Sequence, residues 1–302
     1  MERVIMRMRP RLLGWLHRSR SGPISLVRRL SYKDIKRGTD SFCRIIYSND
    51  YGTAYKAKFT DGQVALVKEV NGLDEGEDNF YEQVELLGRL HHRHILALKG
   101  FSTGRKRLLV FENIEFGNLK EHLNDPLKTP LNWKTRLRIA VGVAAALEYL
   151  FLFSNPPVYR VNISSSTIVL DESFNAKLSD VGLLLPVGNV HAASNPPCSK
   201  DCEGQSCGSI IFQLGVLLLE LITGQSSEKT GLIQWIQEAH FRSSIQKMID
   251  PDLGNNYDSR ELRNLLAVAR LCTTSGCRPR FSVPQLFRYL QNKLDNPHQT
   301  IN

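Results

Sequence analysis

Strand-like and helix-like hydrophobic patterns follow one another along the first third of the chain. From Ile45 to Val70, β-branched and aromatic residues are broken at Asp50-Tyr51-Gly52 and at Asp61-Gly62, which predicts strands joined by tight turns. Strand character returns at 95–98 and at 108–111. Between Val70 and the run at 95–98, the apolar residues recur at helical spacing, at Phe80, Val84, Leu87 and Leu90. The pattern therefore predicts a small, sheet-rich unit that contains one helix.

Beyond Gly117 the pattern is mostly helical, and no internal repeat occurs. The predicted helices are Trp133 to Phe153, Ile210 to Ile222, Leu232 to Ala239, Arg260 to Cys272 and Pro284 to Leu294. A sheet-rich segment followed by a larger helical segment favours an α+β fold with two lobes. We place the lobes at about 43–111 and 115–294, within one domain that spans 38–294. Residues 295–302 form a short C-terminal tail.

The positive charge of the chain lies near its N-terminus. A chain of 302 residues with 42% hydrophobic content can bury a full core, so the protein is globular despite its net charge of +9. Residues 1–37 hold eleven Lys and Arg against Glu2 and Asp34, whereas residues 38–302 hold equal numbers of acidic and basic residues. Because this first stretch is Arg-rich, poor in acidic residues and contains two glycines and two prolines, we predict a mostly unstructured basic tail over 1–37.

Three functions compete for this basic tail. A solvated segment or one that binds an anionic membrane surface is favoured, because clustered Lys and Arg are attracted to anionic lipid. An Arg-rich, acid-poor composition is also typical of an organellar transit peptide. Nucleic-acid binding is not expected, since no aromatic-interleaved groove or reading helix accompanies the charge.

Cysteine usage and hydropathy indicate an intracellular chain without a membrane span. The six cysteines form no C-x-x-C pair, so neither a disulfide framework nor a zinc site is predicted, although three of them lie within 198–207. The cluster His91-His92-Arg93-His94 is interpreted as the polar end of a helix. The apolar run at 210–222 is interrupted by polar residues and indicates a core helix, and the run at 12–16 is too short for a signal peptide.

Several strings occur in the order and spacing of a protein kinase domain. They are LSYKDI at 30–35, LGRLHHRHI at 87–95, LLVFENIEFGNLKEHL at 108–123, LNWKTRLRIA at 131–140, AKLSDVGL at 176–183, GVLLLELITGQ at 215–225 and RPRFSVPQL at 278–286. Through them the chain resembles the cytoplasmic kinase domain of plant receptor-like kinases over about residues 30–294. The resemblance implies the two-lobed protein-kinase fold, with a small β-rich N-lobe and a larger helical C-lobe.

The phosphate half of the implied nucleotide site departs from the family pattern. The glycine-rich loop, whose backbone amides approach the phosphates of ATP, aligns with residues 47–52 (YSNDYG), and only its last glycine is kept. We therefore expect a hairpin without a phosphate cradle. Lys68 matches the lysine that pairs with the α- and β-phosphates. The usual glutamate partner of this lysine aligns with Gln83, so we expect a neutral hydrogen bond between Lys68 and Gln83.

The catalytic loop carries the largest departures. The H-R-D triplet aligns with Arg160-Val161-Asn162, so Asn162 replaces the catalytic aspartate. By the same alignment, Ser164 replaces the phosphate-contacting lysine and Thr167 replaces the asparagine that holds a metal ion. An amide cannot accept the proton of a substrate hydroxyl, and the loss of a general base alone costs about 10²–10⁴ in rate. The three positions predict a degenerate catalytic site.

Other nucleotide contacts of the family are kept. Asp180, in the Asp-Val-Gly triplet at 180–182, matches the metal-binding aspartate of the D-F-G motif. The lobe-joining segment matches the backbone that receives adenine in the family, with Glu112 and Ile114 as the contacting residues. The resemblance therefore implies weak binding of ATP and Mg²⁺ at Lys68, Glu112, Ile114 and Asp180, with Asp180 as the metal ligand.

The segment that docks a peptide substrate in the family is incomplete. Only 26 residues separate Gly182 from Ser209, and they contain no A-P-E triplet. Arg278 is present although its glutamate partner is missing. Ile210 replaces the aspartate that anchors the catalytic loop, and we expect it to turn a polar hub into core packing.

These departures favour a pseudokinase of the receptor-like kinase family that acts through protein interaction in kinase signalling. A weakly active, ATP-dependent Ser/Thr kinase is the alternative, and a degraded gene product without a maintained role is a third. Other receptor-like kinases are the expected partners. Residues 1–37 are expected to contact an anionic membrane surface and no nucleic acid, which implies a cytoplasmic location with peripheral attachment to the plasma membrane.

Overall fold

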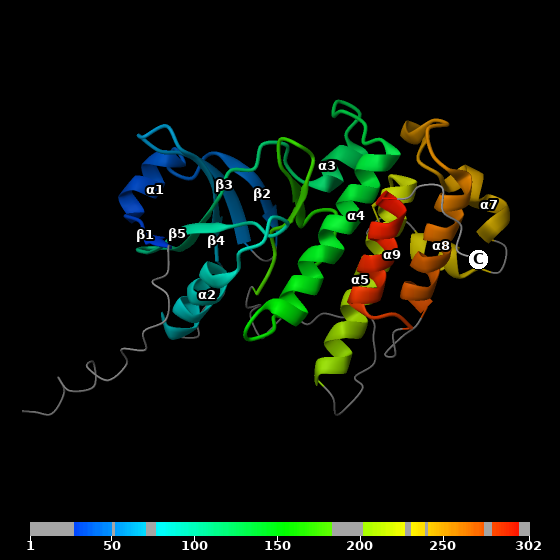
Figure 1. The fold of residues 1–302 in the computed structure, drawn as a ribbon. Helices are drawn as coiled ribbons and strands as arrows, with labels where there is room; N and C mark the ends of the chain where they lie inside the picture. Colours follow the sequence, from blue (N-terminus) through cyan, green and yellow to red (C-terminus); the bar gives the residue numbers. More distant parts are fainter. Residues whose placement is uncertain are drawn as a thin grey trace, which may run out of the picture.

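The protein has two lobes that follow one another along its length (Figure 1). The computed structural model describes residues 27–49, 52–70, 77–182, 202–226, 231–238, 241–274 and 280–295. A β-sheet with helices α1 (Tyr32–Gly38) and α2 (Glu77–Arg89) forms the small lobe, and helices dominate the large lobe. This arrangement confirms the predicted α+β fold.

The small lobe is organised around a six-stranded sheet. Its strands are β1 (Arg28–Arg29), β2 (Ile45–Asn49), β3 (Gly52–Lys58), β4 (Val64–Glu69), β5 (Leu98–Thr103) and β6 (Arg107–Phe111). Their order is β1-β5-β6-β4-β3-β2, with β1 parallel to β5 and the other neighbours antiparallel. The strands predicted from 45 to 70 and at 108–111 are confirmed, whereas 95–98 provides only a bridge and the first residue of β5.

The N-terminal boundary of the folded lobe differs from the prediction. A mostly unstructured tail over 1–37 is wrong for its second part, because β1 pairs with β5 and α1 is a capped helix. The Ser31 hydroxyl accepts a hydrogen bond from the backbone amide two residues further on (3.2 Å), and Ile35 is fully buried. The folded lobe therefore begins by Arg28, and residues 1–26 lie outside the described part of the chain.

The two faces of the sheet are buried by different partners. On one face, Ala65 and Val67 of β4 pack with Ile35 of α1. Because side chains alternate along a strand, Leu66 and Lys68 point to the opposite face, where Leu66 belongs to the main core with residues of α2. This alternation places Lys68 in the cleft between the lobes.

The large lobe consists of helices arranged about α4 and α5 (Figure 1). Its elements are α3 (Leu119–Asn124), α4 (Trp133–Glu148), a π-helical turn (Tyr149–Phe153), β7 (Ile168–Leu170), β8 (Ala176–Leu178), α5 (Cys202–Thr223), α6 (Leu232–Gln237), α7 (Phe241–Met248), a 3-10 turn (Pro251–Leu253), α8 (Ser259–Thr274) and α9 (Val283–Asp295). α4 packs against α9 and β8, while α5 packs against α8. The five helices predicted in this lobe are confirmed, whereas α3 and α7 are too short to show a clear period.

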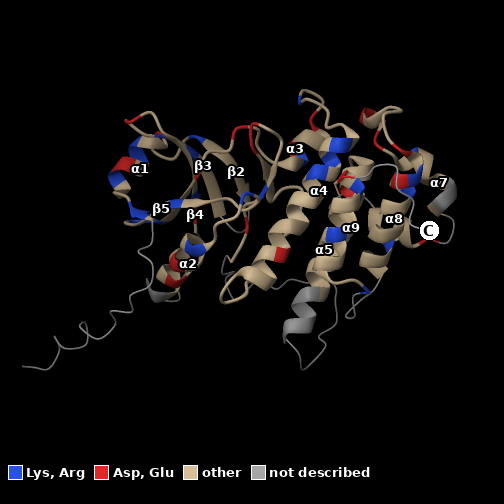
Figure 2. Ribbon diagram, viewed as in Figure 1, with Lys and Arg blue, Asp and Glu red and all other residues tan. Residues whose placement is uncertain are grey.

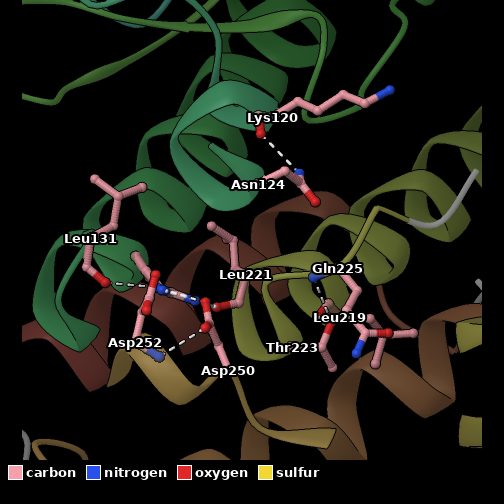
Figure 3. A network of polar contacts seen from close by, with 10 residues as sticks. Lys120, Asn124, Leu131, Leu219, Leu221, Thr223, Gln225, Asp250 and Asp252 are labelled. Carbon is pink, nitrogen blue, oxygen red and sulfur yellow. Dashed lines mark hydrogen bonds and ion pairs between the residues drawn. The ribbon is translucent and has the colours of Figure 1, made fainter. Parts of the chain in front are cut away.

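A buried ion pair connects separate segments of the large lobe (Figure 3). Arg136 on α4 is 2% exposed, and its Nη2 lies 2.6 Å from Oδ2 of Asp250, at an angle outside hydrogen-bond geometry. Nε and Nη1 of Arg136 donate to the carbonyl oxygens of Leu131 (2.7 Å) and Leu221 (2.9 Å). Gly224 has φ +68°, and a Cβ there would overlap the Asp250 carboxylate, so this position requires glycine.

The histidines that follow α2 are packed against the large lobe. His92 stacks on Tyr149 at 5.1 Å, and burial lowers the pKa of His92 to about 4. His94 is buried, with Nδ1 2.8 Å from the Ala176 carbonyl oxygen, and burial also lowers its pKa. The interpretation of this cluster as a polar helix end is therefore wrong for His94, because α2 ends earlier, at Arg89, and His94 joins the core.

Neither a metal cluster nor a membrane span occurs in the part of the chain that the structure describes. No group of three or more His, Cys, Asp or Glu in the described ranges is suited to a metal ion. None of the helices in these ranges is long and apolar enough to cross a bilayer. The apolar run at 210–222 lies within α5 and packs against α8, as predicted for a core helix.

We expect Asp250→Ala to lower the free energy of unfolding by about 3–5 kcal/mol, because the Arg136 guanidinium would stay buried without its counter-charge. Urea denaturation followed by circular dichroism measures the change. Asp252→Ala is the matched control, since Asp252 is exposed, and it should cost less than about 0.5 kcal/mol. Equal costs for the two substitutions would contradict the role of the ion pair.

Candidate nucleotide and catalytic site

The predicted site residues come together at the cleft between the lobes. β4 supplies Lys68, and the segment after β6 supplies Glu112 and Ile114. Asn162 lies in the catalytic loop before β7, and Asp180 follows β8. The catalytic loop and the segment that begins at Asp180 lie against each other through a β-bridge.

The ammonium group of Lys68 is buried and is held by the backbone. Lys68 is 8% exposed. Its Nζ donates hydrogen bonds to the carbonyl oxygen of Ser179 at 2.7 Å and to the Ser179 hydroxyl at 3.3 Å. The same nitrogen lies 5.8 Å from the ring centroids of Tyr47 and of Phe111, which adds cation–π attraction. Lys68 is therefore satisfied by the residue that precedes Asp180.

Gln83 does not partner Lys68, so the predicted hydrogen bond between them is wrong. Gln83 is 2% exposed on α2, yet neither its Oε1 nor its Nε2 has a hydrogen-bond partner among the described residues. The ammonium group takes the Ser179 carbonyl instead, because the backbone fixes that acceptor beside it. An unsatisfied buried amide costs about 1–3 kcal/mol. At this position α2 brings neither a charge nor a hydrogen bond to the lysine.

The hairpin at the cleft is formed by β2 and β3, as expected from the sequence. Gly52 has φ +142°, and a Cβ there would overlap the backbone of β4, so this glycine serves strand packing. The ring of Tyr47, which stands where the family has a glycine, lies beside the Lys68 ammonium group. Asp50 and Tyr51 lie outside the described residues. A ring therefore occupies space where a glycine would leave backbone amides open.

Hydrogen bonds join the catalytic loop to the segment at Asp180. The Asn162 backbone N–H donates to the Asp180 carbonyl oxygen at 3.1 Å, and the Gly182 N–H donates to the Arg160 carbonyl oxygen at 2.8 Å. The side-chain Nδ2 of Asn162 donates to Oδ2 of Asp180 at 3.3 Å. Asn162 is thus a donor to the carboxylate that the family uses for its metal ion, and it offers no base to a substrate hydroxyl.

Ser164 and Thr167 make hydrogen bonds within the catalytic loop itself. The Thr167 hydroxyl accepts a hydrogen bond from the Ser164 backbone N–H (3.0 Å) and donates one to the Asn162 carbonyl oxygen (2.8 Å). The Ser164 hydroxyl lies 2.8 Å from the Ser166 hydroxyl. Because Thr167 is also 7% exposed, its hydroxyl stabilises the turn of the loop where the family has a metal ligand.

An anchor of the catalytic loop that the sequence analysis missed lies on α5. Ile210 is 2% exposed and joins the core as expected, but other side chains of α5 still hydrogen-bond to the backbone of the catalytic loop. Oε1 of Gln213 accepts a hydrogen bond from the Ile163 N–H at 2.8 Å, and Oε2 of Glu220 accepts one from the Ser165 N–H at 3.3 Å. Residues three apart share one face of a helix, so the spacing from Ile210 to Gln213 was the available signal.

The segment that joins the lobes combines an engaged side chain with backbone groups that have no backbone partner among the described residues. The Glu112 carboxylate is occupied, because its Oε1 accepts hydrogen bonds from Lys177 Nζ (2.8 Å) and from the Ala97 N–H (3.0 Å). Within the described ranges, neither the Glu112 carbonyl nor the Ile114 amide has a backbone partner. These two main-chain groups are the ones through which the segment would receive adenine.

Several expected features fall outside the described residues. The substrate-docking segment includes residues 183–201, and Arg278 belongs to another such stretch. Cys198 lies in the first of these, and the side chains of Cys202 and Cys207 are likewise undescribed. The described part of the cleft therefore comprises the nucleotide and catalytic-base positions, without the surface that would hold a peptide.

The family of protein tyrosine and serine/threonine kinases matches residues 41–246 of this chain. The chain therefore belongs to the protein kinase family. A probable receptor-like protein kinase of Arabidopsis thaliana is 36% identical over 301 residues, which cover 91% of this chain and 44% of that protein. The probable serine/threonine-protein kinase PBL26 of the same species is 36% identical over 269 residues, which cover 80% of this chain and 65% of PBL26. The chain thus spans about half the length of these relatives.

Solved plant-type pseudokinases share this fold. The pseudokinase domain of BIR2, an immune regulator of the RLK/Pelle family, is similar with a TM-score of 0.75 and 28% identity, over 90% of this chain and 86% of that domain. A second pseudokinase, in its apo form, is similar with a TM-score of 0.71 and 25% identity, over 89% of this chain and 94% of that one. The relatives therefore include both kinases and pseudokinases.

We expect Gln83→Met to raise the free energy of unfolding by about 1 kcal/mol or more, because a side chain of similar volume replaces a buried amide without partners. For a domain of this size, the melting temperature should rise by about 2–4 °C per kcal/mol. Glu82→Met is the matched control on the exposed side of α2 and should give no rise. A loss of stability specific to Gln83→Met would show that the amide is hydrogen-bonded in solution and would contradict this geometry.

Proposed function

We propose that this protein is a pseudokinase of the receptor-like kinase family that acts through protein interaction in kinase signalling. The observation that carries the proposal is the contact between Asn162 and Asp180, in which the amide at the base position donates its side-chain N–H to the carboxylate. A general base must accept the substrate proton, and an amide does not. The base position, Asn162, therefore offers no group that would activate a hydroxyl for attack on the γ-phosphate.

The other positions of the cleft support the same proposal. Lys68 donates hydrogen bonds to Ser179. It has no carboxylate partner at position 83 of α2, since Gln83 stands there in place of the usual glutamate. Thr167 uses its hydroxyl within the loop. Loss of the base alone raises the barrier by about 3–5 kcal/mol, and losses within one catalytic unit do not simply add. Together they leave little capacity for phosphoryl transfer.

A weakly active Ser/Thr kinase is the second candidate, because Lys68 and Asp180 are retained and relatives such as PBL26 are described as kinases. Positioning and electrostatic stabilisation supply much of the catalysis of phosphoryl transfer, so a site without its base keeps a residual route. The two candidates differ in whether labelled phosphate is transferred in a manner that depends on Lys68.

We propose that any ATP is bound weakly and chiefly through its adenine. Backbone recognition by Glu112 and Ile114 depends little on side-chain identity, whereas phosphate binding would need Lys68 to leave Ser179 and Mg²⁺ to displace Asn162 from Asp180. Asp180 is the metal ligand that we propose, since its carboxylate is an oxygen donor of the kind that Mg²⁺ prefers. The adenine half is thus better preserved than the phosphate half.

We propose other receptor-like kinases as partners and the cytoplasm as the location. BIR2, with the same fold, is described as an immune regulator of its kinase family, which offers a precedent for such a role. Residues 1–26 hold six arginines against Glu2, and we propose that they contact an anionic membrane surface rather than nucleic acid. A transit peptide is the alternative for these residues.

Purified full-length protein should incorporate no labelled phosphate from Mg·ATP, into itself or into a generic substrate, above the level of Lys68→Ala. The reason is the combined change at Asn162, Ser164 and Thr167. Asp180→Asn is a second control that leaves the lysine in place. Incorporation that both substitutions abolish would show an active kinase and would overturn the proposal.

Adenosine should bind with nearly the affinity of Mg·ATP in titration calorimetry, because the phosphate half of the cleft adds little. Removing Mg²⁺ should change the affinity for ATP less than about threefold, which is below 1 kcal/mol. A preference for Mg·ATP of about tenfold or more, equivalent to about 1.4 kcal/mol, would mean that the phosphate site is intact.

A further inference from the structure

A hollow of about 1040 Å³ lies on the small lobe, on the side of the sheet that α1 covers. Its walls come from β1, α1, the β3–β4 turn, β5 and the end of β6. Apolar side chains of this face line its floor, namely Leu30, Phe59, Ala65 and Val110. The volume is at the upper end of the range for ligand pockets, about 300–1,000 Å³. Lys68 points to the opposite face of the sheet, so the hollow is separate from the phosphate site.

Basic side chains surround this hollow. Arg28, Arg44, Lys58 and Lys99 line it, are exposed, and make no ion pair with any described residue. They come from four separate segments of the chain, so the fold and not the sequence gathers them. Figure 2 shows further basic residues, together with an acidic one, on α1, which forms one wall of the hollow.

The acidic residues of the hollow are already engaged. Asp34 pairs with Arg37 at 2.9 Å, and Glu112 pairs with Lys177 at 2.8 Å. Asp61 accepts a hydrogen bond from the backbone N–H of Gln63 within its own turn (3.0 Å). This hydrogen bond leaves the charge of Asp61 in place, but the four unpaired basic side chains outnumber this one unpaired carboxylate, so the potential over the apolar floor is positive.

The N-terminal segment of this chain is not a suitable occupant. Residues 1–26 carry six arginines and one glutamate, so they are repelled by the same charge. Residues 38–302 hold equal numbers of acidic and basic residues, so the excess at the hollow is a local feature of the surface. The complementary occupant is an acidic segment of another molecule.

We infer that this hollow is a docking site for an extended, acidic segment of a partner protein. In an extended segment, alternate side chains point to opposite sides, so carboxylates can meet the basic wall while apolar side chains meet the floor. A bilayer presents a broad surface and would not enter a hollow lined by α1 and the β3–β4 turn. The inference rests on the proposed interaction function and names a surface and a partner chemistry for it.

The test is a fluorescence-anisotropy titration of full-length protein with a short labelled peptide in which glutamate alternates with leucine. We expect saturable binding that weakens as salt rises and that is lost when glutamine replaces the glutamates. The charge-reversed variant Lys58→Glu with Lys99→Glu should bind the peptide with an affinity reduced by about tenfold or more. Absence of saturable binding, or equal binding of the glutamine peptide, would overturn the inference.

Lys134→Glu with Lys247→Glu is the matched control, since both lysines are exposed on the large lobe and the net change in charge is the same. Its affinity should stay within about twofold, because charges beyond the Debye length are screened. An equal loss in the control would show non-specific attraction and overturn the site. Melting curves check that each variant folds. If Lys58→Glu with Lys99→Glu fails to fold, Arg28→Glu with Arg44→Glu takes its place in the test.

Vesicles that contain phosphatidylserine form the second arm of the test. Lys58→Glu with Lys99→Glu should leave vesicle binding by the full chain unchanged, because the hollow is assigned to a peptide. Loss of vesicle binding with unchanged peptide binding would assign these lysines to a membrane surface and overturn the inference. Phosphoryl-transfer assays report on the proposed function and these titrations on the hollow, so the two failures can be told apart.

Discussion

A buried positive charge in the cleft determines how the rest of the site is arranged. The Lys68 ammonium group is almost removed from solvent, and a buried charge without partners would be costly. Its acceptor is the carbonyl of Ser179, a residue whose N–H and hydroxyl both donate to the Thr167 carbonyl oxygen. Since Ser179 is directly followed by Asp180, the contact also helps to fix the position of the Asp180 carboxylate. The small lobe thereby contacts the large lobe without nucleotide, and without a glutamate at the Gln83 position of α2.

The catalytic loop completes this arrangement with contacts that are structural in kind. Asn162 donates to Asp180, Thr167 bonds within its loop, and Gln213 on α5 holds the Ile163 amide. Asn162 and Thr167 hydrogen-bond to protein groups at positions that contact substrate or metal in the family. Gln213 accepts a hydrogen bond from a backbone amide of the same loop. The cleft therefore keeps a folded geometry through contacts within the protein, and the basic hollow lies on the other face of the sheet.

Much of the architecture could be predicted from the sequence, because alternation and helical periodicity report directly on burial. The order of the motif strings assigned Asn162 and Asp180 to one site, and the structure brings their side chains into contact. The acceptor of Lys68 could not be predicted, because it depends on how α2 and the Asp180 segment sit relative to β4. Helix α1 was missed because basic composition concealed the capped turn at Ser31 and the buried Ile35.

The most direct test of this account is a crystal structure of the protein with a non-hydrolysable ATP analogue and Mg²⁺. The account predicts that Lys68 Nζ stays within hydrogen-bond distance of the Ser179 carbonyl and that Asn162 stays on Asp180. Any bound nucleotide should be held at the Glu112–Ile114 backbone with its phosphates poorly ordered. A structure in which Lys68 has left the Ser179 carbonyl and binds well-ordered phosphates would contradict the account.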